Sequence, residues 1–333
     1  MASITASWSR LAATEQLQRS SHNINAVGST IYIFGGELKP REPRDNDLHK
    51  IAVNGSASVQ SVKAPEVAPA PRVGSTSAAI GDKIYFFSGR GGPEMAPVDE
   101  TGAVWELDTT SNEWTLLKPS SAAHPEARSY HSTASNGKDT IYIHAGCPEK
   151  GRLSDLWSFN TLKKEWKQLT SAPDPPRGGT SIAWADGKLY RMNGFDGQKE
   201  VGGDLDVYDP AADSWSTISF QADGKDGPGA RSVGALLPVK LNGGTSLVTL
   251  FGESDPSSLG HQGAGKMLSD IWAYSLEKGT WSEINAKSSE GTPDARGWFD
   301  ADVVSVDGKD SVAVSGGLGE TNERLNDLWV LSF

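Results

Sequence analysis

One sequence unit recurs six times along this chain of 333 residues and constrains its fold more than any other feature. Each unit opens with an arginine, and the six are Arg19, Arg72, Arg128, Arg177, Arg231 and Arg296. Small residues and a turn signal follow, then a β-rich run such as IYIFGG, an aromatic strand such as DLWSFN, and a strand marked by a lone tryptophan. These last-strand tryptophans are Trp114, Trp166, Trp215 and Trp281.

The spacing of the units predicts an all-β fold. Successive arginines lie 53, 56, 49, 54 and 65 residues apart, and four strands per period are typical of one propeller blade. No long segment has the apolar spacing of a helix. We therefore expect a single domain over residues 1–333, a six-bladed propeller. Unit six ends after its third strand, and the stretch around Trp8 resembles the missing fourth, so the N-terminal strand should close the C-terminal blade.

Composition excludes several function classes. The net charge is −11 and no basic block exists, which argues against nucleic acid as a partner. No run of about 18 apolar residues is present, so no membrane partner or span is expected, and the N-terminus lacks the apolar stretch of a signal peptide. The single cysteine, Cys147, excludes a disulfide scaffold. We expect a cytoplasmic monomer.

The GG-ended strands, the DLW strands and the spaced tryptophans resemble kelch repeats. The stretches FGGE, PPRGG…GFDG…VYDP…W, FGE…H.GAGKM and TPDARGW…SGG…NDLW also occur in the order seen in specifier proteins. Those are the nitrile-, epithio- and thiocyanate-forming kelch proteins of glucosinolate breakdown. The resemblance extends from Trp8 to Phe333 and implies a kelch propeller with lyase activity assisted by Fe(II).

Propeller topology places the six repeat arginines on one face, because each precedes the first strand of its unit. Two interpretations follow. The arginines form a basic rim around the channel, suited to an anionic ligand, or they bond neighbouring carbonyl groups and pair with Asp and Glu. The sequence alone leaves both open.

The loop after the second strand of unit five carries Glu253, Asp255 and His261 within nine residues. Carboxylates with a histidine are typical of non-haem Fe(II) sites, although a polar loop in which Asp255 starts a turn and His261 caps it explains the same residues. The specifier resemblance implies a Glu-x3-Asp-x3-His metal site. Glu253 and His261 match it and would be catalytic, whereas Ser257, a weaker neutral ligand, occupies the middle position. The expected metal ligands are Glu253, Asp255, Ser257 and His261.

The resemblance also implies a substrate site on the same face. Arg90 and Arg152 match the arginines that hold the substrate's sulfate in that family. Trp298 resembles an aromatic residue that faces the substrate, and Tyr130 occupies an equivalent inner position. Packing between blades is the alternative role for Trp298.

These observations favour a specifier-like lyase that converts an anionic, sulfated substrate, such as a glucosinolate aglucone, to a nitrile with Fe(II). Two alternatives stay open. One is a non-catalytic kelch propeller that binds a protein or peptide partner through its arginine-rimmed face, and the other is a metal-free metabolite-tailoring enzyme. An enclosed cavity of roughly 300–1,000 Å³ favours the enzymes, and a shallow open face favours the binding protein.

Overall fold

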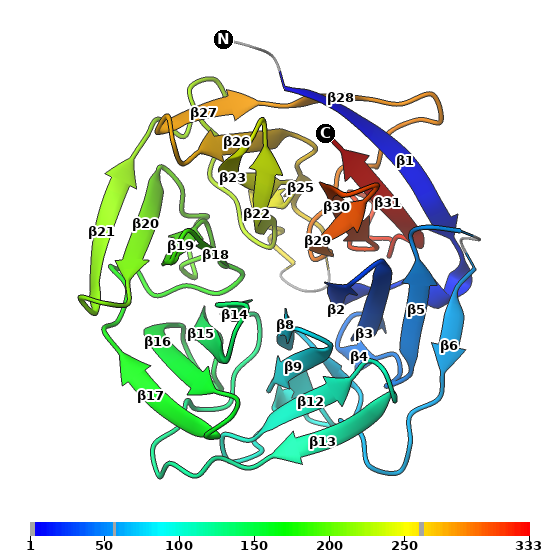
Figure 1. Cartoon of the computed structure of the whole chain (residues 1–333), viewed down its shortest axis with the longest axis vertical. Coiled ribbons are helices and arrows are strands. Elements are labelled where there is room, and N and C mark those ends of the chain that lie inside the picture. The colour runs from blue at the N-terminus through cyan, green and yellow to red at the C-terminus, as the bar shows by residue number, and fades with distance from the viewer. Residues whose placement is uncertain (1–3, 56–57, 260–262) are drawn as a thin grey trace.

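The computed structural model describes residues 4–55, 58–259 and 263–333. The chain is all-β: its helical structure in these ranges is one 3₁₀ turn, η1 (Glu15–Leu17). Six sheets of four or five strands are arranged around a common centre (Figure 1). No helix among the described residues is long and apolar enough to cross a membrane.

Each of the first three sheets is an antiparallel meander made from one sequence unit. Sheet 1 contains β2 (Ser20–Val27), β3 (Thr30–Lys39), β5 (Leu48–Ala52) and β6 (Gln60–Val62), with β4 (Glu42–Pro43) paired to β3. Sheet 2 contains β8 (Thr76–Ile80), β9 (Lys83–Phe87), β12 (Val104–Asp108) and β13 (Glu113–Leu117). Sheet 3 contains β14 (Ser132–Ser135), β15 (Thr140–Gly146), β16 (Leu153–Asn160) and β17 (Glu165–Leu169).

The remaining sheets follow the same plan, except that sheet 6 uses both ends of the chain. Sheet 4 contains β18 (Ser181–Ala185), β19 (Lys188–Met192), β20 (Asp204–Asp209) and β21 (Ser214–Ser219). Sheet 5 contains β22 (Ala235–Leu241), β23 (Gly244–Leu250), β26 (Ile271–Ser275) and β27 (Thr280–Glu283). Sheet 6 contains β29 (Asp300–Val306), β30 (Lys309–Ser315), β31 (Asp327–Ser332), β1 (Thr5–Ala13) and β28 (Asn285–Lys287).

The two ends of the chain pair with each other, as the sequence predicts. Strand β1 runs antiparallel to β31, with Ser7 opposite Ser332 and Ala13 opposite Asp327. In Figure 1, β1 lies along the outer side of β31. The outer edge of β1 is covered over three residues by the parallel strand β28. The N-terminal strand therefore supplies the fourth strand that unit six lacks.

The last-strand tryptophans explain one regularity of the repeat. Two of them pack against a phenylalanine of the preceding sheet: ring centroids are 5.1 Å apart for Trp114 and Phe34, and 5.3 Å for Trp166 and Phe87. Trp8 on β1 stacks on Phe251 at 5.9 Å in the same way. Because aromatic pairs at these distances add to the energy of burial, these tryptophans help to hold adjacent sheets together.

The first strands β2, β8, β14, β18, β22 and β29 face the centre, and each contacts the next, including β29 with β2 (Figure 1). The residue two positions after each repeat arginine has a positive φ of 47–60°, and these are Ser21, Gly74, Tyr130, Gly179, Val233 and Trp298. Each of these six backbone N–H groups donates to the carbonyl of its counterpart in the preceding unit, and Ser21 donates to Trp298, at 2.7–3.1 Å. We call these six residues the hydrogen-bonded ring.

Candidate functional site

The repeat arginines are structural. All six side chains are buried, with 0–3% of their surface exposed. Each donates to a carbonyl near the end of the second strand of its own unit, at 2.7–3.2 Å. Five also pair with a carboxylate at 2.6–3.2 Å, and the pairs are Arg19–Asp45, Arg72–Glu100, Arg128–Asp155, Arg231–Asp270 and Arg296–Asp327. The interpretation of these arginines as a basic rim is therefore wrong, because all six guanidinium groups are enclosed and five are paired with a carboxylate.

Unit four departs from this pattern. Among the described residues Arg177 has no carboxylate within 4.0 Å, and burial together with the neighbouring charge of Arg191 lowers its pKa to about 10. The unit has Asp206 where units three, five and six have tryptophan in the DLW or DIW strand. Asp206 accepts from the buried Arg191 at 2.5 Å. A second buried ion pair thus replaces the usual arginine–aspartate–tryptophan cluster.

A cavity of about 460 Å³ opens on the face where the arginines begin each unit. Two short sheets built from connecting segments each contribute one lining residue, Arg90 and Glu253. The first sheet contains β7 (Arg72–Val73), β10 (Arg90–Gly91) and β11 (Ala96–Pro97), and the second contains β24 (Glu253–Ser254) and β25 (Lys266–Met267). We call this space the mouth cavity. Its volume and its mixed lining of aromatic and charged side chains are typical of a small-molecule site rather than a flat interface.

Arg90 and Arg152 come from different units and line the mouth cavity together. Arg90 donates to neutral groups, namely Ser129 Oγ at 3.2 Å and the carbonyls of Met95 at 2.9 Å and Pro148 at 3.1 Å. The Arg152 guanidinium lies over the Phe195 ring, 5.0 Å from its centroid. Within the described ranges neither arginine has a carboxylate within 4.0 Å. Both positive charges are therefore available to an anion in this cavity.

Glu253 lies on the wall of the mouth cavity and is 5% exposed. Its Oε1 accepts the Gly265 N–H at 2.7 Å. Burial raises the pKa of Glu253, while the hydrogen bonds from Gly265 and from the Trp298 side chain oppose that rise. Glu200 lies nearby: burial, with the charges of Glu253 and Asp255, raises its pKa to about 7.

The other three predicted metal ligands do not all lie at the mouth cavity. Ser257 lines the mouth cavity beside Glu253, whereas Asp255 is exposed and lies outside the lining. His261 lies outside the described residues. Among the residues that are described, no three His, Cys, Asp or Glu side chains converge on one point.

Tyr130 and Trp298 contact each other at the bottom of the mouth cavity. Their rings meet edge to face, with centroids 5.1 Å apart and an interplanar angle of 87°. Burial raises the pKa of the Tyr130 hydroxyl. Both side chains also line a second cavity of about 380 Å³ that runs between the first strands. We call this second cavity the channel.

Phe195 and Cys147 are among the residues of the mouth cavity that sequence reasoning missed. Phe195 supports the Arg152 guanidinium, and the GFDG motif that contains it is visible in the sequence. Cys147 also lines the cavity, where burial raises the pKa of its thiol and the charges of Arg152 and Arg90 oppose this. Its place directly after a strand ending in Ala-Gly is the available sequence signal.

The profile of the KLHDC2/KLHL20/DRC7 Kelch-repeats domain matches residues 21–242, about two thirds of the sequence. The chain belongs to this kelch-repeat family. The matched region contains sheets 1–4 and the first strand of sheet 5. The kelch repeats thus account for the recurring units between Ser21 and Asn242.

This kelch chain also resembles proteins of different kinds. It is 28% identical over 335 residues to the N-(sulfonatooxy)prop-2-enimidothioate sulfolyase of Thlaspi arvense, covering 93% of this chain and 91% of that protein. It is 23% identical to the leucine-zipper-like transcriptional regulator 1 homolog of Drosophila melanogaster, over 99% of this chain but 33% of that protein. Kelch domain-containing protein 3 of Bos taurus is 28% identical over 50% of this chain and 44% of its own length. The chain is a kelch protein that resembles the specifier proteins.

Proposed function

We propose that this kelch protein is a specifier-like lyase that binds an anionic, sulfated small molecule in the mouth cavity. The observation that carries the proposal is the convergence of Arg90 and Arg152 on one cavity, with neutral groups as their partners. Guanidinium groups suit sulfate because they donate paired hydrogen bonds to its oxygens. The likeness to a sulfolyase along nearly the whole chain supports the same substrate class.

In this proposal Fe(II) binds at Glu253. The buried Glu253 carboxylate and the Ser257 hydroxyl, both on the cavity wall, provide two oxygen donors, and His261 would supply a nitrogen. When bound, the metal supplies a Lewis acid for the sulfur of the substrate. Arg90 and Arg152 hold the sulfate that leaves, and the surrounding protein limits access of water.

The proposal includes the finer architecture, a closed six-bladed kelch propeller. The hydrogen-bonded ring and the continuous contacts between first strands support closure. Closure is relevant to function because Arg90, Arg152 and Glu253 come from three different units. A closed frame would fix their separation before any ligand binds, which lowers the entropy cost of binding.

The test is product analysis with an unstable thiohydroximate O-sulfate, generated in place by a thioglucosidase acting on allyl glucosinolate. With Fe(II), the wild-type protein should shift the product from isothiocyanate to nitrile, as measured by gas chromatography. Arg90→Met and Arg152→Met should each lower nitrile formation by about tenfold or more, because each removes a charge-assisted hydrogen bond. Lys163→Met, an exposed change in the turn after β16, is the matched control and should behave as wild type.

Iron binding has its own readout. After anaerobic loading and desalting, wild-type protein should retain iron and Glu253→Gln should retain far less. Nitrile formation that does not depend on iron would instead favour a metal-free tailoring enzyme. A complete absence of product change, with wild-type behaviour in both arginine variants, would contradict the lyase proposal.

A protein-binding role is the second candidate. It is favoured by the kelch family match and by the likeness to the Drosophila leucine-zipper-like regulator homolog, which spans this whole chain. A partner would have to reach a face whose repeat arginines are buried. The enclosed position of Glu253 therefore favours the small-molecule proposal.

A further inference from the structure

The mouth cavity and the channel meet at the hydrogen-bonded ring. Tyr130, Gly179, Val233 and Trp298 line both cavities, so these residues form the boundary between them. The ring positions carry side chains of very different size: Gly74 and Gly179 have none, whereas Tyr130 and Trp298 carry large aromatic groups. The two large groups also contact each other, with centroids 5.1 Å apart.

The Tyr130 ring extends across the opening rather than away from it. A Cβ atom added at Gly74, the preceding ring position, would lie 2.8 Å from the Tyr130 ring. Gly74 therefore provides the space that the tyrosine occupies. Because Trp298 also meets this tyrosine edge to face, the pair spans part of the interior of the hydrogen-bonded ring.

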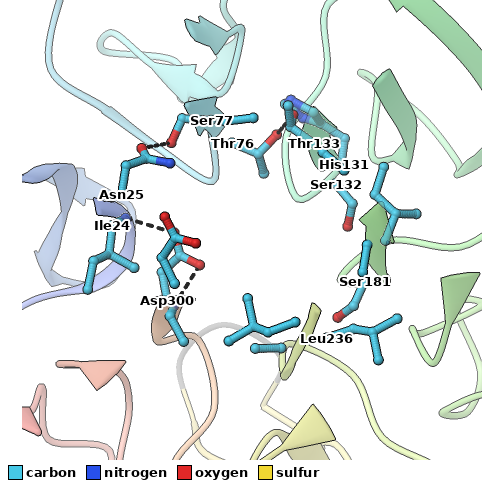
Figure 2. A pocket seen from close by; sticks show the side chains of 18 of the residues that line it. Ile24, Asn25, Thr76, Ser77, His131, Ser132, Thr133, Ser181, Leu236 and Asp300 are labelled. Atoms are coloured by element: carbon cyan, nitrogen blue, oxygen red, sulfur yellow. Dashed lines mark hydrogen bonds between the residues drawn. The ribbon is translucent and has the colours of Figure 1, made fainter. Parts of the chain in front are cut away.

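Several polar groups in the wall of the channel, on the far side of this pair, are already bonded to each other (Figure 2). Ser77 donates to Asn25 at 2.6 Å, Thr76 and Thr133 share a hydrogen bond of 2.5 Å, and Ser181 donates to the Gly234 carbonyl at 3.0 Å. These hydroxyl groups join neighbouring first strands. An apolar chain that entered the channel would therefore leave few of these groups unpaired.

We infer that Tyr130 and Trp298 form a plug between the mouth cavity and the channel, and that this plug limits the length of the apolar part of the ligand. The ligand class is an anion with an unbranched apolar chain. Its charged end lies at Arg90 and Arg152 and its chain points toward the plug. The position of the charged end rests on the proposed function, whereas the plug itself does not.

Tyr130→Gly tests this inference. Glycine occupies the equivalent ring positions 74 and 179 and adopts positive φ without strain, so the ring should persist. Tyr130→Phe is the matched control, because it keeps the aromatic ring and loses the hydroxyl. Thermal unfolding of both variants checks the fold. If Tyr130→Gly fails to fold, Trp298→Gly is the second variant that removes part of the plug.

The probes are n-alkyl sulfonates from butane to decane, used below their micelle concentrations, and n-alcohols of matched length. Binding is measured by isothermal titration calorimetry. Wild type and Tyr130→Phe should gain affinity with chain length and then reach a plateau. Tyr130→Gly should continue to gain about two- to fourfold per methylene beyond that plateau, because the chain enters the channel.

The outcomes separate the two proposals. Identical length dependence in wild type and Tyr130→Gly, for sulfonates and alcohols alike, overturns the plug and leaves the anion site standing. If sulfonates bind wild type no better than alcohols do, the anion site is overturned. The length dependence of alcohol binding then tests the plug by itself. A plateau that disappears in Tyr130→Gly and persists in Tyr130→Phe supports the plug.

Discussion

At the scale of single residues, the strongest local constraint is the buried arginine at the start of each unit. Arg231 shows the arrangement: its guanidinium donates to the Phe251 carbonyl at 3.0 Å and to both oxygens of Asp270 at 2.7–2.8 Å. Asp270 also accepts the Trp272 indole N–H at 2.8 Å. One carboxylate thus joins a connecting segment to the third strand of its sheet.

Asp270→Asn should destabilise the protein. The substitution leaves the Arg231 charge enclosed without its counter-charge, and breaking a buried pair costs about 3 kcal/mol. Urea denaturation measures this as a lower free energy of unfolding. The control is Lys63→Met, which breaks the exposed Lys63–Asp47 pair and should cause no measurable change. Equal effects of the two substitutions would contradict a structural role for the arginine pairs.

At the scale of elements, the contact between β2 and β29 joins the first and last sequence units through side chains. Asp300 and Asp302 on β29 accept the backbone N–H groups of Ile24 and Ala26 on β2, each at 2.8 Å. Enclosure in the channel wall raises the pKa of Asp300 to about 7 and that of Asp302 to about 6. The hydrogen bonds that the two carboxylates accept from Ile24 and Ala26 oppose this rise in pKa.

This contact should make stability depend on pH. The folded pKa of Asp300 exceeds its ordinary value of 3.8, so the folded state binds the proton more tightly than the unfolded state does. The resulting stabilisation is complete below about pH 4 and is lost as pH rises through about 7. Asp300→Asn should therefore reduce the fall in melting temperature between pH 4 and pH 8.

Calorimetric melting temperatures of wild type and Asp300→Asn across that range provide the measurement. Asp223→Asn is the control, because backbone hydrogen bonds lower the pKa of that exposed carboxylate, which leaves it ionised across most of this range. Parallel pH profiles for wild type and Asp300→Asn would argue against the shifted carboxylate.

At the scale of the whole molecule, β1 connects the two ends of the chain. Removing the first 13 residues would expose the edge of β31 and take Trp8 away from Phe251. We expect this truncated protein to aggregate, because an open strand edge pairs with other chains. Trp8→Ala keeps the strand and should remain soluble while losing about 3 kcal/mol of stability. Size-exclusion chromatography distinguishes these outcomes, and a soluble truncation that melts like wild type would contradict the role of β1.

Much of the architecture could be predicted because it follows from local patterns in the sequence. The alternation of β-branched and aromatic residues predicted strands, the period predicted units, and the incomplete sixth unit predicted the pairing of β1 with β31. Membership of the kelch-repeat family confirms the interpretation of the repeat. The role of the repeat arginines was less accessible, because each carboxylate partner lies 26–39 residues further along the chain.

The sequence by itself determined the all-β repeat, its number of units and the residue types at the mouth, since strand propensity and periodicity depend on near neighbours in the chain. Only the tertiary structure decided which arginine side chains are paired with a carboxylate and which are not. Arg231 is enclosed with Asp270, whereas Arg90 and Arg152, from separate units, share a cavity with Glu253. Burial and ion pairing arise from groups that folding brings together from distant positions, and these contacts determine whether an arginine stabilises the fold or can bind an anion.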